Sequence, residues 1–381
     1  MRVLIAPNSY RDGPRAETVA EAMAAGVRRA LPQAELVLAP LADGGDGTLA
    51  VVMRVLGGSR ESRVARDPLG RPTTAHFGIS HDGTTAVIEV AEASGLRLIP
   101  LADRDPFHSS SYGTGELIRA ALDLKVPRIL IGAGGSGTID AGVGALAALG
   151  AVFRDARGNA LDPTPAGLVS LAEVDLAALD NRLLGTEVIV LGDVHTPLRS
   201  NATVYGKQKG VRPETACQLA EVVHQVGCLA QERGHEILET AWRGAGGGLA
   251  GGLVAFAGAR AVCGAEFIAR LAGFPGHFQD ADLLLTGEGR LDATTAFGKL
   301  PLVIARMAAD HGVAAVIIAG SVADDGLLLP EGIACFSATP QPCVLDEALA
   351  AAPIHITKVA EQVTRLFALA KRGDTHHAHD R

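Results

Sequence analysis

The residues best suited to chemistry follow a short apolar run near residue 285. The segment from Ala281 to Asp292 has the sequence Ala-Asp-Leu-Leu-Leu-Thr-Gly-Glu-Gly-Arg-Leu-Asp. Its apolar part predicts a buried strand, and the glycine loop that follows carries Glu288 and Arg290. Ligands of open α/β sheets bind beyond the carboxyl ends of strands. The loop is therefore suited to hold a metal, a phosphate or a reacting hydroxyl, and the alternative is an ion pair between Glu288 and Arg290 that braces it.

A second glycine loop, Asp43-Gly44-Gly45-Asp46-Gly47-Thr48, follows the apolar run at 35–41. Its two acids would orient Mg²⁺ through water or hold a substrate hydroxyl. The alternative is a simple helix start with Asp46 near the N-cap. Three glycines in six residues exceed what a cap requires, so the pattern favours a functional loop.

A third loop, Gly132 to Gly137, satisfies GxGxxG, and Asp155 lies where a ribose-binding acid of a dinucleotide site would be expected. One alternative is a tight strand-to-helix turn. Another is anion binding by backbone N–H groups at a helix start. We favour anion binding because Ser136, Thr138 and Asp140 add polar groups that a nicotinamide loop does not need, although Asp140 is equally suited to be an N-cap.

Further charged residues follow the strand predicted at 187–191. Asp193 ends it and is a candidate general base or metal ligand. The segment Gly206-Lys207-Gln208-Lys209-Gly210 suits a phosphate, with a solvated turn as the equal alternative. Arg11 and Lys299 are candidate contacts for phosphate or carboxylate, although each alone is typical of a surface cation. No Walker A, HExxH or GxSxG motif is present.

Alternating apolar strands and helices must position these loops. Short strands at 3–6, 35–41, 282–286 and 314–319 alternate with helical patterns, which predicts parallel, doubly wound α/β structure. Residues 73–79 and 84–90 flank His81-Asp82-Gly83 and predict an antiparallel hairpin. We therefore predict a two-domain α/β fold: a discontinuous, doubly wound Rossmann/flavodoxin-like domain from residues 1–72 and 275–381, with an inserted mixed α/β domain at 73–274.

Composition limits the classes of function. The chain has 381 residues, 48% hydrophobic, with a net charge of -8. Scattered cations in an acidic protein make nucleic acid an unexpected partner. Five cysteines without a CxxC pair indicate a reduced, cytoplasmic setting, and no apolar stretch approaches the ~18 residues of a membrane helix. We expect a small-molecule substrate, no membrane association, and a monomer or homodimer.

Taken together in this order, the loops resemble the type I glycerate kinase family. The match extends over nearly the whole chain, and several blocks in one order are more specific than any one of them. The matching segments are 7–11, 42–48, 92–96, 112–117, 134–136, 193–194, 208–210, 286–292 and 298–299.

The resemblance implies Mg²⁺- and ATP-dependent phosphorylation of D-glycerate, usually at the 2-hydroxyl, in an interdomain cleft. Phosphoryl transfer depends mainly on positioning and charge stabilisation. The implied nucleotide contacts, catalytic groups and metal ligands then follow. The ATP phosphates are assigned to Gly134, Gly135, Ser136, Thr138 and Lys299, charge neutralisation to Lys209 and Arg11, the base to Asp193, and Mg²⁺ to Asp43 and Asp46, with Asp193 as the alternative.

The acceptor acid is assigned to the remaining candidates. Arg290 would pair with its carboxylate, and Glu288 would hold a hydroxyl or orient Arg290. The full predicted acceptor set is Asn8, Ser9, Glu288, Arg290 and Asp292.

The chain departs from the family pattern in the loops that flank these residues. Asn8 replaces an Asp, Arg11 replaces a Lys, and Ile139 replaces an Asn. Arg for Lys is not neutral at a bidentate site. Gly192 stands for a Cys and Thr196 for an Asn, so the number of substrate hydroxyls or metal waters that the site can hold is changed.

Within the kinase class, the alternatives are a kinase of a related small hydroxy acid and a glycerate kinase that forms 3-phosphoglycerate. Two rival functions come from other classes. A nicotinamide oxidoreductase would use Gly132 to Gly137 with Asp155, but it leaves the loops at 42–48 and 286–292 unexplained. A non-catalytic binder of small phosphorylated acids would be stabilised by ligands without turning them over.

Overall fold

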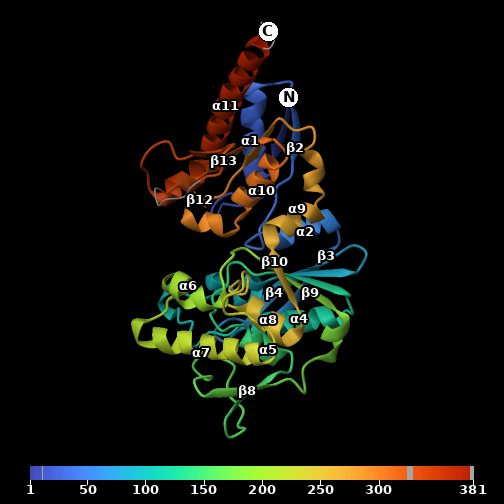
Figure 1. The fold of residues 1–381 in the computed structure, drawn as a ribbon, viewed down its shortest axis with the longest axis vertical. Coiled ribbons are helices and arrows are strands. Elements are labelled where there is room, and N and C mark those ends of the chain that lie inside the picture. The colour runs from blue at the N-terminus through green and yellow to red at the C-terminus, as the bar shows by residue number, and fades with distance from the viewer. Residues whose placement is uncertain (11, 324–328, 378–381) are drawn as a thin grey trace. The chain divides into compact units, whose positions relative to one another are not determined.

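The computed structural model describes residues 1–10, 12–323 and 329–377, with side chains 294, 296 and 372–377 not described (Figure 1). The chain forms two compact units. Unit 1 consists of Met1–Ala42 with Ala265–Arg381, and unit 2 consists of Asp43–Gly264. The predicted two-domain α/β fold, with one domain built from both chain ends, is confirmed.

The first boundary lies at residues 42/43, whereas the sequence analysis placed it at 72/73; the second lies at 264/265 rather than 274/275. The segment after Asp43 belongs to unit 2 because its elements pack there. Strand β3 (Ser59–Arg66) pairs antiparallel with β4 (Pro72–Ile79), and helix α2 (Thr48–Leu56) contacts β4 and β5 (Thr85–Glu89). Hydrophobic alternation within 43–72 could not show which sheet these elements would join.

Unit 1 is a five-stranded parallel sheet in the order β15-β13-β11-β1-β2. Its three central strands are short apolar runs buried on both faces, as expected when helices cover both sides of a parallel sheet, whereas the edge strands β2 and β15 are partly exposed. Its elements are β1 (Arg2–Ile5), α1 (Ala16–Ala30), β2 (Glu35–Leu38), α9 (Gly264–Leu271), β11 (Leu283–Thr286), β12 (Arg290–Leu291), α10 (Leu300–Ala309), β13 (Ala314–Ala319), β14 (Ser321–Val322), β15 (Ile333–Ser337) and α11 (Leu345–His377).

The core of unit 1 follows the alternation of side chains along its strands. Val3 and Ile5 pack with α1 and α11 on one face. Helix α10 contacts β11, β13 and β15. Helix α11 runs alongside α1 (Figure 1). Met23 of α1 and Ile356 of α11 are buried in the same hydrophobic core.

Unit 2 is a six-stranded mixed sheet in the order β10-β9-β6-β5-β4-β3. The predicted hairpin is present, because β4 and β5 pair antiparallel with Phe77 opposite Ile88, while the strands from β5 to β10 are parallel. The remaining elements are α3 (Val90–Ser94), α4 (Tyr112–Asp123), β6 (Arg128–Gly132), α5 (Val143–Ala148), β7 (Val152–Asp155), β8 (Leu171–Asp175), β9 (Glu187–Gly192), α6 (Asn201–Lys209), α7 (Pro213–Glu232), α8 (Leu249–Ala257) and β10 (Arg260–Cys263).

Parallel strands end at one edge of a sheet, and this places the candidate loops of unit 2. Strands β6 and β9 are neighbours, with Gly132 opposite Leu191. The chain after each strand therefore emerges at the same edge, where ligands bind in open α/β sheets.

Candidate active site

Three loops of unit 2 meet at the carboxyl ends of β6 and β9. The Ala133 amide donates to the carbonyl of Leu191 at 3.1 Å, and the Gly134 amide donates to the carbonyl of Gly44 at 2.9 Å. These bonds tie the loops at 43–48 and 133–138 to the end of β9. We call the candidate residues in these loops, with Asp193 and Lys209, the phosphate-site residues.

The glycines among the phosphate-site residues lie against carboxylates. A Cβ added at Gly134 would lie 3.0 Å from Asp193 Oδ2, and one added at Gly135 would lie 2.8 Å from Asp46 Oδ1. Gly135 is exposed and has a φ of 69°, a conformation that favours glycine. The loop therefore presents bare backbone to a ligand, with two acids beside it.

Lys209 reaches this loop from the last turn of α6. Its Nζ donates to Ser136 Oγ and to the carbonyl of Thr138, both at 2.8 Å. Burial lowers the pKa of Lys209 to about 8, although Asp193 and Asp140 oppose this shift. Both hydrogen bonds go to uncharged oxygens, so they orient the ammonium without neutralising its charge.

Asp140 is not the N-cap of α5, which is Gly142, but its side chain bonds to the chain at the start of this helix. Its buried carboxylate accepts from the amide and hydroxyl of Ser111, both at 2.7 Å, and from the amides of Gly142 and Gly144 at the start of α5. Burial raises its pKa, and these hydrogen bonds oppose the rise. Asp140 therefore fixes the loop after Thr138.

Glu89 is a member of this region that the sequence analysis missed. Its Oε1 accepts from the amide of Leu49 at 2.6 Å, which holds the start of α2 directly after the acidic loop. Burial raises its pKa to about 7, and the charge of Asp46 adds to the rise. The available signal was an acid ending a buried strand, as in the other candidate loops.

The candidate residues of unit 1 lie at the ends of β1 and β11, which are neighbouring strands. The Asn8 amide donates to the carbonyl of Gly287 at 2.9 Å, and Thr286 Oγ1 donates to the carbonyl of Ala6 at 2.7 Å. Asn8 Oδ1 accepts from the amide of Ser9 at 2.8 Å. The segments 8–9 and 286–292 are therefore joined; with Lys299, their candidate residues form the acceptor group.

Ion pairs organise the acceptor group. Glu288 is buried, accepts from Thr295 Oγ1 at 2.7 Å, and has Lys299 Nζ 3.7 Å from its Oε2. Lys299 also lies 3.8 Å from Asp292 Oδ1. Arg290 pairs with Asp292 at 3.3 Å. The predicted brace between Glu288 and Arg290 is thus replaced by separate contacts, and Thr295 is a partner that the sequence analysis missed.

With both groups described, the comparisons with known proteins decide the family. A model described as "Glycerate kinase family" matches residues 3–368. A glycerate kinase of Halalkalibacterium halodurans is 38% identical over 91% of this chain and 93% of its own. The glycerate 2-kinase of Escherichia coli is 36% identical over 98% of this chain and 99% of its own.

A solved structure agrees. A crystal structure of a protein assigned as glycerate kinase 2 from Salmonella typhimurium LT2 superposes with a TM-score of 0.78 at 38% identity, covering 98% of this chain and 99% of that one. The chain belongs to the glycerate kinase family. It is therefore a phosphotransferase that acts on an alcohol group.

Within this glycerate kinase family member, the predicted residues are divided between the units. Lys299 was predicted with the ATP-phosphate residues, but its ion pairs join it to Glu288 and Asp292 in unit 1. Arg11 lies outside the described residues. Unit 2 contains Asp43, Asp46, Gly134, Gly135, Ser136, Thr138, Asp193 and Lys209, and unit 1 contains Asn8, Ser9, Glu288, Arg290, Asp292 and Lys299.

The altered position 139 is a core position. Ile139 is fully buried and belongs to the hydrophobic core of unit 2. An apolar side chain suits this fully buried position, where an amide without a hydrogen-bond partner would be unfavourable.

The residues fit Mg²⁺ and a nucleotide in their chemistry. Exposed Gly135 offers backbone beside Asp46, and Lys209 supplies a buried positive charge. Among the described residues, no group of three or more His, Cys, Asp or Glu side chains could hold a metal ion. Mg²⁺ is usually held by one or two carboxylates with phosphates and water, and Asp43 and Asp46 could supply such carboxylates.

The context of the GxGxxG motif differs from a dinucleotide fingerprint. The motif should open a helix directly, but α5 begins only at Val143. Asp155 lies in β7, which pairs with β8 outside the six-stranded sheet, and it accepts hydrogen bonds from Asn159. The structure therefore lacks the arrangement that the oxidoreductase alternative requires. The six-residue helix α5 also begins too late in the chain for its first residues to follow the glycine loop directly.

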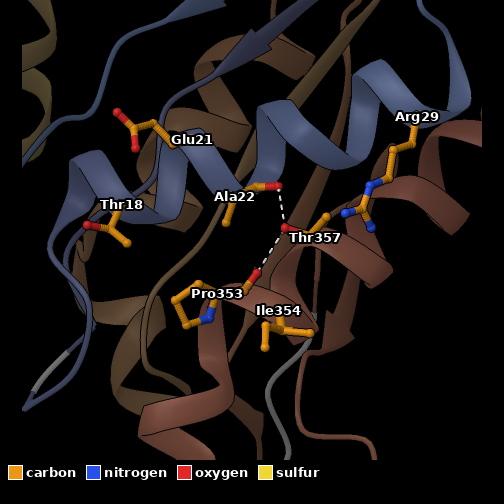
Figure 2. Close-up of a pocket in the computed structure, with 7 residues that line it drawn as sticks. All are labelled: Thr18, Glu21, Ala22, Arg29, Pro353, Ile354 and Thr357. Atoms are coloured by element: carbon orange, nitrogen blue, oxygen red, sulfur yellow. Dashed lines mark hydrogen bonds between the residues drawn. The ribbon is translucent and has the colours of Figure 1, made fainter.

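A cavity of about 290 Å³ lies between α1 and α11 of unit 1 (Figure 2). Thr357 Oγ1 lies 2.9 Å from the carbonyls of both Ala22 and Pro353, which links the two helices. No predicted site residue lines this cavity, so it has no part in the candidate active site. The lining residues are Thr18, Glu21, Ala22, Arg29, Pro353, Ile354 and Thr357.

None of the helices in the described part of the chain combines the length and apolar character needed to cross a membrane.

Proposed function

We propose that this protein transfers the γ-phosphoryl group of ATP to the 2-hydroxyl of D-glycerate, with Mg²⁺. The observation that carries the proposal is the buried Lys209, which donates to Ser136 and Thr138 in a glycine loop beside Asp193. The family match and the relatives named glycerate kinase support the same substrate.

The phosphate-site residues would bind the nucleotide. The backbone amides of Gly135 and Ser136 would hold phosphate oxygens, and Gly134, whose own amide donates to the Gly44 carbonyl, would let the chain approach the ligand closely. The charge of Lys209, oriented by Ser136 and Thr138, would stabilise the negative charge that develops on the transferred oxygens. The hydrogen bonds fix this charge in advance, so little reorganisation is needed during the reaction.

Asp43 and Asp46 would hold the Mg²⁺ ion with the nucleotide phosphates. Asp43 is buried and accepts from the amide of Gly45 at 3.1 Å, whereas Asp46 is exposed. When bound, the ion would neutralise part of the phosphate charge.

The acceptor group would bind the hydroxy acid. Arg290 and Lys299 are the cations available for its carboxylate, and Lys299 is the more buried of the two, with 24% of its side chain exposed against 68% for Arg290. Glu288 would accept from a substrate hydroxyl. Asn8 and Ser9 are held next to the Glu288 loop by the hydrogen bond from the Asn8 amide to the Gly287 carbonyl.

Asp193 is our choice for the base. Its carboxylate would accept the proton of the 2-hydroxyl as that oxygen forms a bond to the γ-phosphorus. The bond between the γ-phosphorus and the bridging oxygen breaks, and ADP leaves with its electron pair. A positioned base of this kind contributes about 10²–10⁴-fold.

The test is ADP release from Mg-ATP with D-glycerate, with the product identified by phosphorus NMR. We expect Mg²⁺-dependent turnover and a 2-phospho product. A 3-phospho product would correct the position of transfer. A panel of small hydroxy acids tests whether the altered Asn8 and Arg11 change the acceptor, and failure with every acid would refute the kinase function.

A further inference from the structure

Trp242, the only tryptophan of the chain, lies in a strained backbone conformation. Its φ is 67°, in the left-handed region, which is unfavourable for a residue other than glycine. Such strain persists only where the surroundings over-determine it, and it gathers at functional sites. Gly244, two residues later, shows that the local sequence supplies glycines freely, yet position 242 carries the largest side chain.

The indole lies beside the phosphate-site residues. A Cβ added at Gly192 would lie 2.9 Å from Trp242 Cε3, so the ring packs directly on the end of β9. Its other neighbour is His195, whose ring is edge-on at a centroid distance of 5.0 Å. Trp242 is half-buried and His195 is exposed. Part of the indole therefore remains exposed.

A buried amide adjoins the loop that carries Trp242. Asn201 is fully buried, and among the described residues neither its Oδ1 nor its Nδ2 has a hydrogen-bond partner. A Cβ added at Gly244 would lie 2.9 Å from Asn201 Oδ1. Nearly all buried polar groups in native proteins are hydrogen-bonded. The unpartnered amide of Asn201 beside this loop is therefore not explained by packing alone.

We propose that Trp242 is the surface on which the adenine base of the nucleotide stacks. The inference rests on the proposed function and assigns the base to one part of the same site. Gly192 contacts the indole, and its neighbour Asp193 contacts Gly134. The indole and the phosphate loop thus contact successive residues at the carboxyl end of β9, and a nucleotide bound beyond this strand end would reach both.

Stacking suits the chemistry of both partners. Every base has a π-face, and stacking of a base on an aromatic side chain is worth enough that its removal weakens binding about 5- to 150-fold. Stacking also predicts tolerance toward the identity of the base. Glycine would carry no penalty at a φ of 67°, so the strain at this position is accepted to place the indole ring there.

The single tryptophan makes the inference directly measurable. We would titrate the full-length protein with ADP and, separately, with inorganic tripolyphosphate while recording tryptophan emission. Stacking predicts a saturable change in emission with ADP and a much smaller one with tripolyphosphate, which lacks a base. Equal changes with both ligands, or none with ADP despite binding, would overturn the inference.

Substitution separates binding from folding. Trp242→Gly removes the ring and also relieves the strained φ, so it should fold, with the melting temperature as the check. We expect the Kd for ADP, measured by calorimetry, to rise at least about 5-fold, while the KM for D-glycerate is unchanged. Trp242→Leu keeps apolar bulk without the ring and should weaken ADP similarly, which provides a second variant if the glycine variant unfolds.

Lys125→Gly is the matched control. Lys125 also has a positive φ, 57°, but it is an exposed residue after α4, outside both groups. It should gain the same relief of strain and keep wild-type ADP affinity. Wild-type ADP affinity in both Trp242 variants would refute the stacking site while leaving the kinase function intact; absence of ATP turnover in the wild type would instead refute the proposed function.

Discussion

The lysines of the two candidate groups differ in their partners. Lys209 is buried and donates to a hydroxyl and a carbonyl, whereas Lys299 lies between the carboxylates of Glu288 and Asp292. Lys209 bonds directly only to neutral oxygens, although the nearby charges of Asp193 and Asp140 raise its pKa, whereas the charge of Lys299 is offset by two ion pairs. We infer that unit 2 acts on the transition state and affects kcat, and that unit 1 selects the acceptor and affects KM.

The largest effect should come from Asp193→Asn. The amide keeps the size of the side chain but cannot accept the proton, so kcat should fall about 10²–10⁴-fold. Steady-state kinetics with D-glycerate, beside a thermal melt showing an unchanged fold, checks this. Near-normal kcat would remove Asp193 from the base role and weaken the assignment of catalysis to unit 2.

Lys209→Met and Lys299→Met test the comparison most directly. Losing a preorganised charge at the transferred group should lower kcat about 10²–10³-fold in Lys209→Met. Lys299→Met should instead raise the acceptor KM about 10- to 100-fold, the range for a lost hydrogen bond to a charged group, with kcat nearly unchanged. The reverse pattern would exchange the roles of the two units.

The pH dependence of Lys209 offers a second test of its charge. Because burial lowers its pKa to about 8, the side chain loses its proton as the pH rises through that value. The kcat of the wild type should therefore decline above about pH 8, whereas the residual activity of Lys209→Met should show no such decline. Parallel profiles for the two proteins would contradict a role for this charge.

Glu89→Gln tests whether the acidic loop of unit 2 is held at a cost in stability. Burial raises the pKa of Glu89 from its ordinary value near 4.5 to about 7, so between these values the folded state binds more protons than the unfolded state. Stability should then fall as the pH rises through this window. Gln can still accept from Leu49, and we expect Glu89→Gln to be more stable than wild type at pH 8 by up to about 3 kcal/mol, with little difference at pH 4.5.

Denaturant unfolding of both proteins at pH 4.5 and pH 8 measures this difference, and other carboxylates cancel in the comparison. Equal stability of the two proteins at pH 8 would show that Glu89 is charged without penalty.

The smallest effect on stability should come from Arg290→Met in unit 1. Exposed ion pairs contribute about 0–1 kcal/mol, and 68% of the Arg290 side chain is exposed. The free energy of unfolding should change by less than about 1 kcal/mol, while the acceptor KM rises because a carboxylate partner is lost. An unchanged KM would leave Lys299 as the cation that selects the acceptor.

The sequence by itself determined the fold class and the positions of the candidate loops. Short apolar runs separated by helical patterns predicted parallel strands, and each glycine loop with charged residues followed such a run. These are local signals, because side-chain periodicity and glycine placement report on the chain within a few residues. The strands β1, β6, β9 and β11 and the loops after them were therefore foreseeable.

Only the tertiary structure decided which residues share a group. Lys299 pairs with Glu288 and Asp292, Thr295 joins them, and Glu89 holds the start of α2. It also joined residues 43–72 to unit 2 and set the indole ring of Trp242 against Gly192. Such contacts depend on strand order and on packing between distant segments, because the free energy that selects them comes from burial and hydrogen bonding that no local stretch of sequence contains.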